Sequence, residues 1–157
     1  MKIVVGADPL GFELKEKVKE HLLAEGHEVS DVGTVNADAP VLYIAASDAV
    51  AKAVAGGEAE RGLVFCGTGM GVSIVANKHK GVYCAVVESE WAAKQCRLIN
   101  NANVLALGGR IFGVPMAIDV VETFLNTEWC ENFVETRRKN ISNLFGQVEA
   151  LENELFK

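Results

Sequence analysis

Continuous apolar runs, separated by segments with helical spacing, constrain the fold of this chain more than any other feature. The runs show no alternation of polar and apolar residues, and they span residues 2–6, 62–65, 82–87 and 103–107. A weaker strand is expected at residues 28–32. Strands that read as unbroken apolar runs are typical of a parallel sheet, because such strands are buried on both faces. The pattern therefore predicts a parallel sheet of five strands with helices on both faces.

The segments between the runs carry helix signals. Gly26 stops the first of them and Gly56 the second, and apolar residues recur in them at helical spacing. The expected helices cover residues 10–25, 43–55, 72–78, 89–98 and 115–125. Five βα units in one chain predict a single α/β domain over residues 1–157, with a Rossmann-like three-layer fold. In such a fold the ligand site lies at the carboxyl ends of the strands.

The tail over residues 131–157 is expected to form a C-terminal helical arm. Its apolar residues follow i, i+3, i+4, i+7 spacing, with acids and amides opposite them. These residues are Ile141, Leu144, Phe145, Val148, Leu151 and Leu155. The arm can pack on its own domain or on a partner subunit. A dimer interface is favoured, because the sheet already has helices for both faces.

Composition excludes several classes of function. The net charge of −6 argues against nucleic acid or an anionic membrane as the main partner. The first apolar run is too short for a signal peptide and no run is long enough to span a bilayer, so a cytoplasmic location is expected. The four cysteines contain no C-x-x-C pair and the three histidines are scattered. No metal site is therefore expected.

Residues 66–71, with the sequence Cys-Gly-Thr-Gly-Met-Gly, follow the apolar run at 62–65 and open onto the helix at 72–78. Glycines at this position let backbone N–H groups converge on an anion, and the helix dipole adds partial positive charge. The same field favours a thiolate at Cys66. The loop thus suits a base or nucleophile beside an oxyanion site. The alternative is a small apolar cysteine that ends a buried strand.

The first strand runs into residues 6–11, with the sequence Gly-Ala-Asp-Pro-Leu-Gly. This loop lacks the Lys-Ser/Thr of a Walker A motif and the G-x-G-x-x-G spacing of a dinucleotide site. NAD and nucleoside triphosphates are therefore not expected as cofactors. Asp8 lies near Cys66 if the first and third strands face one crevice, and it can also serve as the N-cap of the first helix. The sequence leaves both roles open.

The fifth strand ends in Gly108-Gly109-Arg110 and is preceded by the asparagine-rich residues 99–103. Amides and an arginine in a crevice at the strand ends suit the recognition of hydroxyls and phosphate. The alternative interpretation is a set of turn-forming asparagines with a surface arginine.

Four motifs occur in order along the chain. They are Gly-Ala-Asp at 6–8, Cys-Gly-Thr-Gly at 66–69 with Ala-Asn-Lys at 76–78, Asn-Asn-Ala-Asn-Val at 100–104 and Gly-Arg at 109–110. Together they resemble the ribose-5-phosphate isomerase B and galactose-6-phosphate isomerase family, over roughly the whole chain. The resemblance implies a cofactor-free aldose–ketose isomerase with a Rossmann-like fold. It also implies a homodimer or tetramer with sites between subunits.

By this resemblance, Cys66 is the base that moves a proton between C1 and C2 of an open-chain sugar phosphate, and Thr68 assists at the reacting oxygens. The residues expected to bind substrate are Asp8, Pro9, Tyr43, Gly67, Gly69, Met70, Gly71, Asn100, Asn101, Arg110 and Arg137. Asp8 is expected to bind sugar hydroxyls, and Asn100 the reacting end of the sugar. The two arginines would hold the phosphate, and the N–H groups of residues 67–71 would stabilise the enediolate.

The sequence departs from the family's pattern in three places, one of which is a pair of residues. Pro9 replaces the usual histidine after the first aspartate, and Ile99 replaces the histidine credited with opening the sugar ring. The usual Arg-His pair falls on Phe133 and Val134, which leaves Arg137. Proline and isoleucine cannot transfer protons. A tetrose 4-phosphate needs no ring opening, because its terminal oxygen is esterified and closure on O3 would give a strained four-membered ring.

These residues predict a self-sufficient isomerase, with a four-carbon sugar phosphate as the expected substrate. One alternative is the cysteine-bearing subunit of a two-protein isomerase of the galactose-6-phosphate type, whose paralogous subunit carries the histidine. A second alternative is a ribose-5-phosphate isomerase. A third is a sugar-phosphate-binding protein without turnover, although a binding protein has no need of a cysteine and a threonine at 66 and 68.

Overall fold

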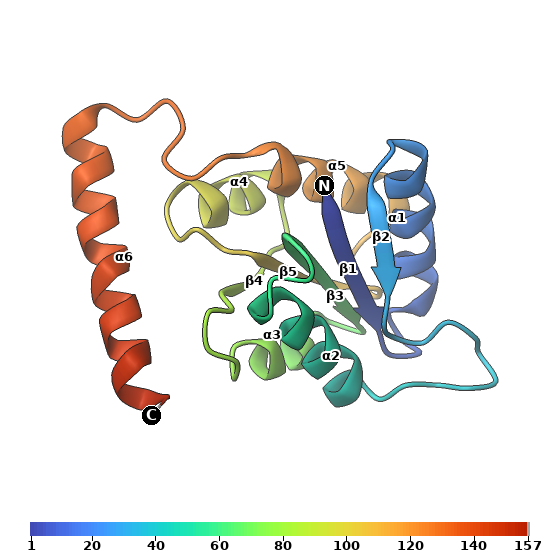
Figure 1. Cartoon of the computed structure of the whole chain (residues 1–157). Helices are drawn as coiled ribbons and strands as arrows, with labels where there is room; N and C mark the ends of the chain where they lie inside the picture. The colour runs from blue at the N-terminus through green and yellow to red at the C-terminus, as the bar shows by residue number, and fades with distance from the viewer. Residues whose placement is uncertain (157) are drawn as a thin grey trace.

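In the computed structural model, which describes residues 1–156, the apolar runs form one five-stranded sheet (Figure 1). Its strands are β1 (Lys2–Ala7), β2 (Glu28–Asp31), β3 (Arg61–Cys66), β4 (Cys84–Val86) and β5 (Val104–Gly108). All neighbouring strands are parallel, in the order β2-β1-β3-β5-β4. The predicted parallel sheet is confirmed, although the run at 82–87 contributes a strand of only three residues.

Six helices accompany the sheet, and the predicted positions hold to within a few residues. They are α1 (Phe12–Ala24), α2 (Tyr43–Ala55), α3 (Met70–Ala76), α4 (Glu90–Leu98), α5 (Val114–Asn126) and α6 (Glu135–Leu155). The start of α1 is two residues later than predicted, because Asp8 Oδ1 accepts the N–H groups of Leu10 and Gly11 and holds them in a turn. The start of α3 is two residues earlier, directly after Gly69.

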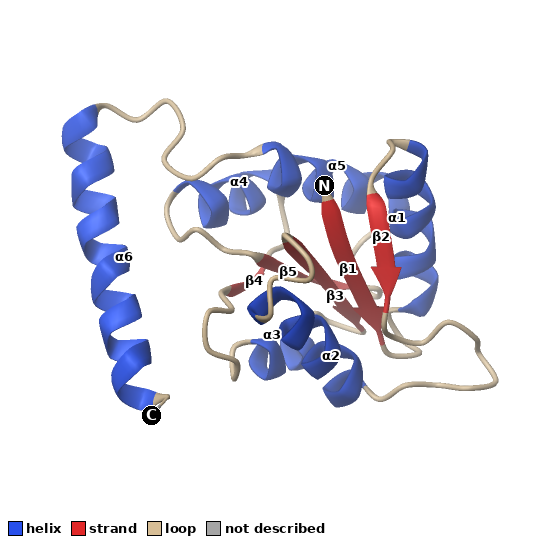
Figure 2. Cartoon of the chain, in the orientation of Figure 1, coloured by secondary structure: helices blue, strands red, loops and turns tan. Residues whose placement is uncertain are grey.

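Two hydrophobic cores explain why the strands lack polar alternation. In β3, Leu63 and Phe65 pack with residues of α1, α4 and α5 on one face, whereas Val64 and Cys66 pack with α2 and α3 on the other. Figure 2 shows the sheet between these two helix layers. Successive side chains of a strand point to opposite faces, so a strand covered on both faces needs apolar residues at every position.

The chain reverses its direction of travel across the sheet at β1. It passes from β1 to β2 on one side, and then crosses to β3 on the other side of β1. Connections that leave in opposite directions open a crevice at the carboxyl ends of the two strands. The N–H of Asp8 donates to Phe65 O at 3.2 Å, so the loops after β1 and β3 meet in this crevice.

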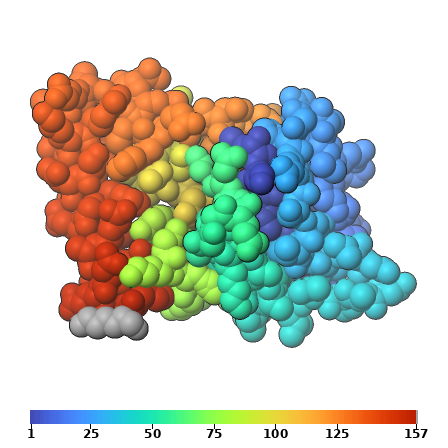
Figure 3. Space-filling view, viewed as in Figure 1, coloured from blue at the N-terminus to red at the C-terminus, as the bar shows by residue number. Residues whose placement is uncertain are grey.

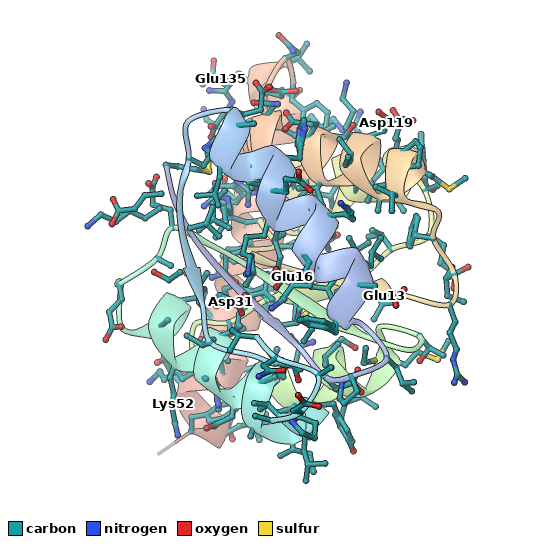
Figure 4. The ribbon with its side chains drawn as sticks, turned by 90° about the vertical axis from the view of Figure 1, so that its right-hand side faces the viewer. Glu13, Glu16, Asp31, Lys52, Asp119 and Glu135 are labelled. Carbon is teal, nitrogen blue, oxygen red and sulfur yellow. The ribbon has the colours of Figure 1, made fainter. Side chains whose placement is uncertain are left out.

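A buried lysine fixes the first helix to the second strand. The Lys15 side chain is wholly buried, and its ammonium group donates to Asp31 and to the carbonyl of Thr34. Figure 4 shows Glu16 on α1 and Asp31 near this helix. Burial alone would raise the pKa of Asp31, but the hydrogen bonds from Lys15 and Lys19 hold that pKa below its usual range. These ion pairs therefore stabilise the fold at pH values above the usual pKa of an aspartate. The stabilisation is lost as the pH falls through the lowered pKa of Asp31.

We expect Lys15→Met to lower the free energy of unfolding by roughly 3 kcal/mol, because Asp31 loses a buried partner. Lys19→Met is the matched control, since Lys19 contacts the same carboxylate from a more exposed position and should cost below about 1 kcal/mol. Urea unfolding of the two variants measures both values. Equal losses would show that burial of Lys15 adds nothing.

Asn77, from the Ala-Asn-Lys motif, covers the outer edge of the sheet. Its Oδ1 accepts the N–H of Cys84 and its Nδ2 donates to the carbonyl of Cys84, both at 2.9 Å. The side chain thereby satisfies backbone groups of the edge strand β4 that could otherwise pair with another chain. At Cys84 the edge of the sheet is therefore already paired within the chain.

The C-terminal helix α6 lies beside β4 and α4, and Figure 3 shows its side chains against this part of the domain. Glu152 accepts hydrogen bonds from Gly81 N at 2.8 Å and from the Tyr83 hydroxyl at 3.1 Å. The Phe145 ring lies 5.0 Å from the Tyr83 ring and 5.3 Å from the Trp129 ring, measured between centroids. Part of the predicted arm therefore packs on its own domain. For Phe145 and Glu152, packing on the chain's own domain, one of the two possibilities that the sequence left open, is what the structure shows.

Ile141 is also buried, but the other four residues of the stripe stay exposed in the single chain. The exposed fractions are 63% for Leu144, 48% for Val148, 55% for Leu151 and 70% for Leu155. Exposed apolar residues in a row of this kind mark an interaction surface. Within residues 1–156, no helix combines the length and the apolar character needed to cross a membrane.

Candidate active site

Cys66 ends β3 with its side chain at the glycine loop. The residue is 6% exposed, and its Sγ accepts a hydrogen bond from the N–H of Gly69 at 3.2 Å. Gly69 reaches this position with a φ of 79°, in the left-handed region that glycine tolerates best. A donor aimed at the sulfur stabilises negative charge on it. The thiol thus lies buried at the turn that joins β3 to α3, with a backbone N–H directed at its sulfur.

Asp8 reaches the same crevice from β1. Its backbone bond to Phe65 places it beside Cys66, as the first of its two predicted roles requires. Its Oδ1 also accepts the N–H groups of Leu10 at 2.9 Å and Gly11 at 3.0 Å. Asp8 therefore shapes the turn before α1, but the prediction that it serves as the N-cap of this helix is wrong, because Gly11 takes that position.

The loop after β5 is bonded directly to the cysteine loop. Gly109 N donates to Cys66 O at 2.8 Å, and Arg110 N donates to Gly67 O at 3.0 Å. A Cβ on residue 109 would lie 2.4 Å from the carbonyl oxygen of Leu10, so only glycine lets the first and fifth loops approach so closely. Arg110 is exposed and stands at the rim of the crevice.

Tyr43, the first residue of α2, forms a further wall of the crevice. A Cβ on Gly71 would lie 3.1 Å from the Tyr43 ring. The buried Ser47 hydroxyl donates to the carbonyl of Val72 and ties α2 to α3. Thr68 and Met70 are exposed at the mouth of the crevice, and Thr68 Oγ1 accepts a hydrogen bond from Met70 N at 3.4 Å.

The structure thus brings most of the predicted site residues together at the carboxyl ends of β1, β3 and β5. These are Asp8, Pro9, Tyr43, Cys66, Gly67, Thr68, Gly69, Met70, Gly71 and Arg110. They offer a thiol, a hydroxyl, a carboxylate and a guanidinium around backbone N–H groups. Such a set suits proton transfer beside an oxyanion.

The expectation that Asn100, Asn101 and Arg110 share one crevice is wrong for a single chain. The two asparagines precede β5, so they lie at its amino end, whereas Arg110 follows its carboxyl end. Asn101 takes a φ of 50°, and its Oδ1 accepts from the buried guanidinium of Arg97 at 3.1 Å. Asn101 thus forms a turn, as the alternative interpretation of these asparagines expected.

Asn100 and Arg137 lie instead on the side of the molecule that carries α6. Asn100 lines a groove of about 140 Å³ together with Ile99, Ile141 and Leu144. Arg137 is exposed one turn before Ile141, and its guanidinium lies 3.9 Å above the Phe133 ring. Both residues thus belong to a second group of predicted site residues, which lies away from Cys66 in the single chain.

Two other cysteines, Cys84 and Cys96, lie on β4 and α4. Burial, with the nearby Cys96 as a smaller cause, raises the pKa of Cys84 above its usual range. Burial raises the pKa of Cys96 to about 11. Both thiols stay protonated near neutral pH and are poor nucleophiles.

Other parts of the described chain offer less chemistry. Residues 1–156 hold no group of three or more His, Cys, Asp and Glu side chains that could bind a metal ion. A cavity of about 500 Å³ lies between α1 and the start of α5. It is lined by Phe12, Glu13 and Phe112 among others, and it contains none of the predicted site residues.

Leu10 is the residue of the crevice that sequence reasoning missed. A Cβ on Gly67 would lie 3.2 Å from Leu10 Cδ1, so this side chain covers the glycine next to Cys66. The signal was present, because Leu10 follows Asp8 and Pro9 in the first loop. A leucine in a polar loop gives no hint of its direction without the fold.

Comparison with known proteins gives consistent matches. The family model described as Ribose/Galactose Isomerase matches residues 3–141. A 4-deoxy-4-sulfo-D-erythrose isomerase of Clostridium sp. (strain MSTE9) is 41% identical over 157 residues, covering 100% of this chain and 99% of the relative. D-erythrulose-4-phosphate isomerase 2 of Mycolicibacterium smegmatis is 39% identical over 131 residues, covering 82% and 86%. The structure of Clostridium thermocellum ribose-5-phosphate isomerase B superimposes with a TM-score of 0.89, at 37% identity and 99% coverage of both chains.

Proposed function

The chain belongs to the ribose/galactose isomerase family, and we propose that it interconverts the aldose and ketose forms of a four-carbon sugar with an acidic group on C4. That it is an isomerase acting on sugars or sugar phosphates follows from its relatives. The finer assignment concerns the substrate, the catalytic base and the assembly.

Ile99 is the observation that carries the substrate assignment. It lies in the groove with Asn100, at the position where the family resemblance expects the ring-opening histidine. A hydrocarbon side chain moves no protons, so the substrate must present a free carbonyl. A four-carbon aldose with a sulfonate or phosphate on C4 has no C4 hydroxyl and cannot close a five-membered ring. The names of two relatives that act on such sugars support this assignment.

The proposed reaction is a proton transfer between neighbouring carbons. The Cys66 thiolate takes the proton from C2 of the aldose, the C–H electron pair forms a C1=C2 double bond, and O1 becomes the enediolate oxyanion. The proton then returns to C1, while the proton of the O2 hydroxyl moves to O1 with the help of Thr68. N–H groups of the glycine loop stabilise the oxyanion, and the fixed dipoles need no rearrangement during the reaction.

The predicted site residues fall into two separate groups in the single chain, and this separation supports a site shared between copies. The crevice holds the base and Arg110, while Asn100 and Arg137 lie on the α6 side with exposed leucines. In a twofold dimer the same two surfaces meet twice, so each copy can complete the other's site. We therefore propose a homodimer, or a tetramer built from such dimers, in which Asn100 and Arg137 of one chain face Cys66 of the other.

An isomerisation assay of the purified protein tests the substrate assignment. We expect kcat/KM for 4-deoxy-4-sulfo-D-erythrose or D-erythrose 4-phosphate to exceed that for ribose 5-phosphate by at least about tenfold. Comparison of the sulfonate with the phosphate identifies the acidic group. Efficient turnover of ribose 5-phosphate alone would contradict the four-carbon assignment. Activity on a hexose 6-phosphate only after addition of a histidine-bearing paralogue would favour the two-protein isomerase.

A further inference from the structure

Leu10 lies between the cysteine loop and the side chain of Arg110. Its Cδ1 and Cβ would lie 3.2 and 3.6 Å from a Cβ on Gly67, and Arg110 Cδ would lie 3.8 Å from the same point. Leu10 therefore stands next to both the cysteine loop and the stem of the arginine. Despite these contacts Leu10 is 51% exposed, so much of its side chain is open to solvent or to a ligand.

The backbone of Leu10 is held by one hydrogen bond and one close packing contact. Its N–H donates to Asp8 Oδ1 at 2.9 Å, and its carbonyl packs against Gly109. Gly109 and Arg110 are themselves bonded to Cys66 and Gly67. The backbones that carry Cys66 and Arg110 are thus held together by hydrogen bonds, and Leu10 packs beside both of them.

We infer that Leu10 sets the length of the carbon chain that the site accepts. This inference rests on the proposed function, in which Cys66 works at C1 and C2 and Arg110 holds the acidic group. Between two fixed ends, a chain with one more carbon must bow outward. The isobutyl group of Leu10 fills space on one side of that path.

The chemistry of leucine adds to the steric effect. The additional carbon of a five-carbon sugar carries a hydroxyl, which needs a hydrogen-bond partner when it leaves water. Leucine has neither donor nor acceptor to offer. The C4 methylene of a four-carbon substrate carries no hydroxyl, and its contact removes apolar surface of Leu10 from water. Leu10 therefore acts as a specificity-determining residue rather than as a catalytic one.

The test compares two sugars that carry the same acidic group, in the wild type and in Leu10→Ala. The pair is ribose 5-phosphate with erythrose 4-phosphate, or the corresponding 5-sulfo and 4-sulfo sugars if the wild type prefers a sulfonate. We expect the ratio of kcat/KM for the five-carbon over the four-carbon sugar to rise about tenfold or more in Leu10→Ala. The substitution keeps the backbone bonds, and a thermal unfolding curve checks the fold.

Two matched variants serve as controls. Leu10→Met keeps the side-chain volume and should leave the ratio within about threefold. Leu23→Ala truncates a leucine of similar exposure, 53%, at the far end of α1 and should leave the ratio unchanged. A folded Leu10→Ala variant with the wild-type ratio would overturn the role of Leu10 while leaving the proposed function intact. A wild type without activity on four-carbon sugars would contradict the proposed function itself.

Discussion

Replacement of Cys66 by alanine or serine is expected to lower kcat by roughly 10³-fold, because the substitution removes the group that moves the proton. Substrate binding should stay within about tenfold of the wild type, since the base acts in the chemical step rather than in binding. Steady-state kinetics give the first value, and titration calorimetry with the preferred substrate gives the second. The backbone bonds of Cys66 to the β5 loop do not involve the side chain, so the crevice should keep its shape.

Cys96→Ala provides the matched control. Cys96 is another buried cysteine, but it belongs to α4 and packs in the hydrophobic core on the other face of the sheet. It should keep nearly normal kcat. Alkylation with iodoacetamide should be fastest at Cys66 and slowed by substrate, since Cys84 and Cys96 have raised pKa values. Normal turnover by Cys66→Ala would remove the assignment of the base.

Charged residues on the exposed face of α6 should yield monomers with at least about 100-fold lower activity. The suitable variant is Leu144→Glu with Leu151→Glu, because these side chains are 63% and 55% exposed in the single chain. Phe145 is unsuitable, since it packs on Tyr83 and Trp129 of its own domain. Burial of two carboxylates at an apolar interface is costly, so association is lost while the domain stays folded. Sedimentation velocity measures the association state, and circular dichroism shows whether the domain stays folded.

Leu23→Glu, on α1, is the control and should leave the assembly unchanged. Mixing of two inactive variants, Cys66→Ala and Arg137→Ala, gives a sharper test of shared sites. In mixed dimers one of the two sites carries both changes and the other carries neither, so about a quarter of the wild-type activity should return. An active wild-type monomer, or no recovery on mixing, would refute the shared site.

The unbroken runs at residues 62–65 and 103–107 were sufficient to predict a parallel sheet, because burial of both faces demands apolar residues at every position. The glycine loop after β3 could also be predicted from the sequence. Three glycines at 67, 69 and 71, between an apolar run and a helical segment, are typical of a tight strand–loop–helix turn. The position of Asp8 and Arg110 at one edge of the sheet could be predicted too, because each follows a strand and the carboxyl ends of parallel strands share one edge. These features are local, or depend only on strand direction.

The placement of Asn100, of Leu10 and of α6 required the tertiary structure. The resemblance put Asn100 in the site, but only the direction of β5 separates it from Cys66 and places it on the α6 side. The approach of Leu10 to Gly67 depends on how closely the loops after β1, β3 and β5 pack, which no pattern in one loop records. The periodicity of α6 predicted an apolar face, but the partner for each residue depends on which aromatic rings the fold places beside it. The sequence alone determined the sheet, the loop that bears the base and the chemistry they allow. The tertiary structure decided which residues meet, because contacts between distant segments depend on the sum of many packing interactions rather than on local preference.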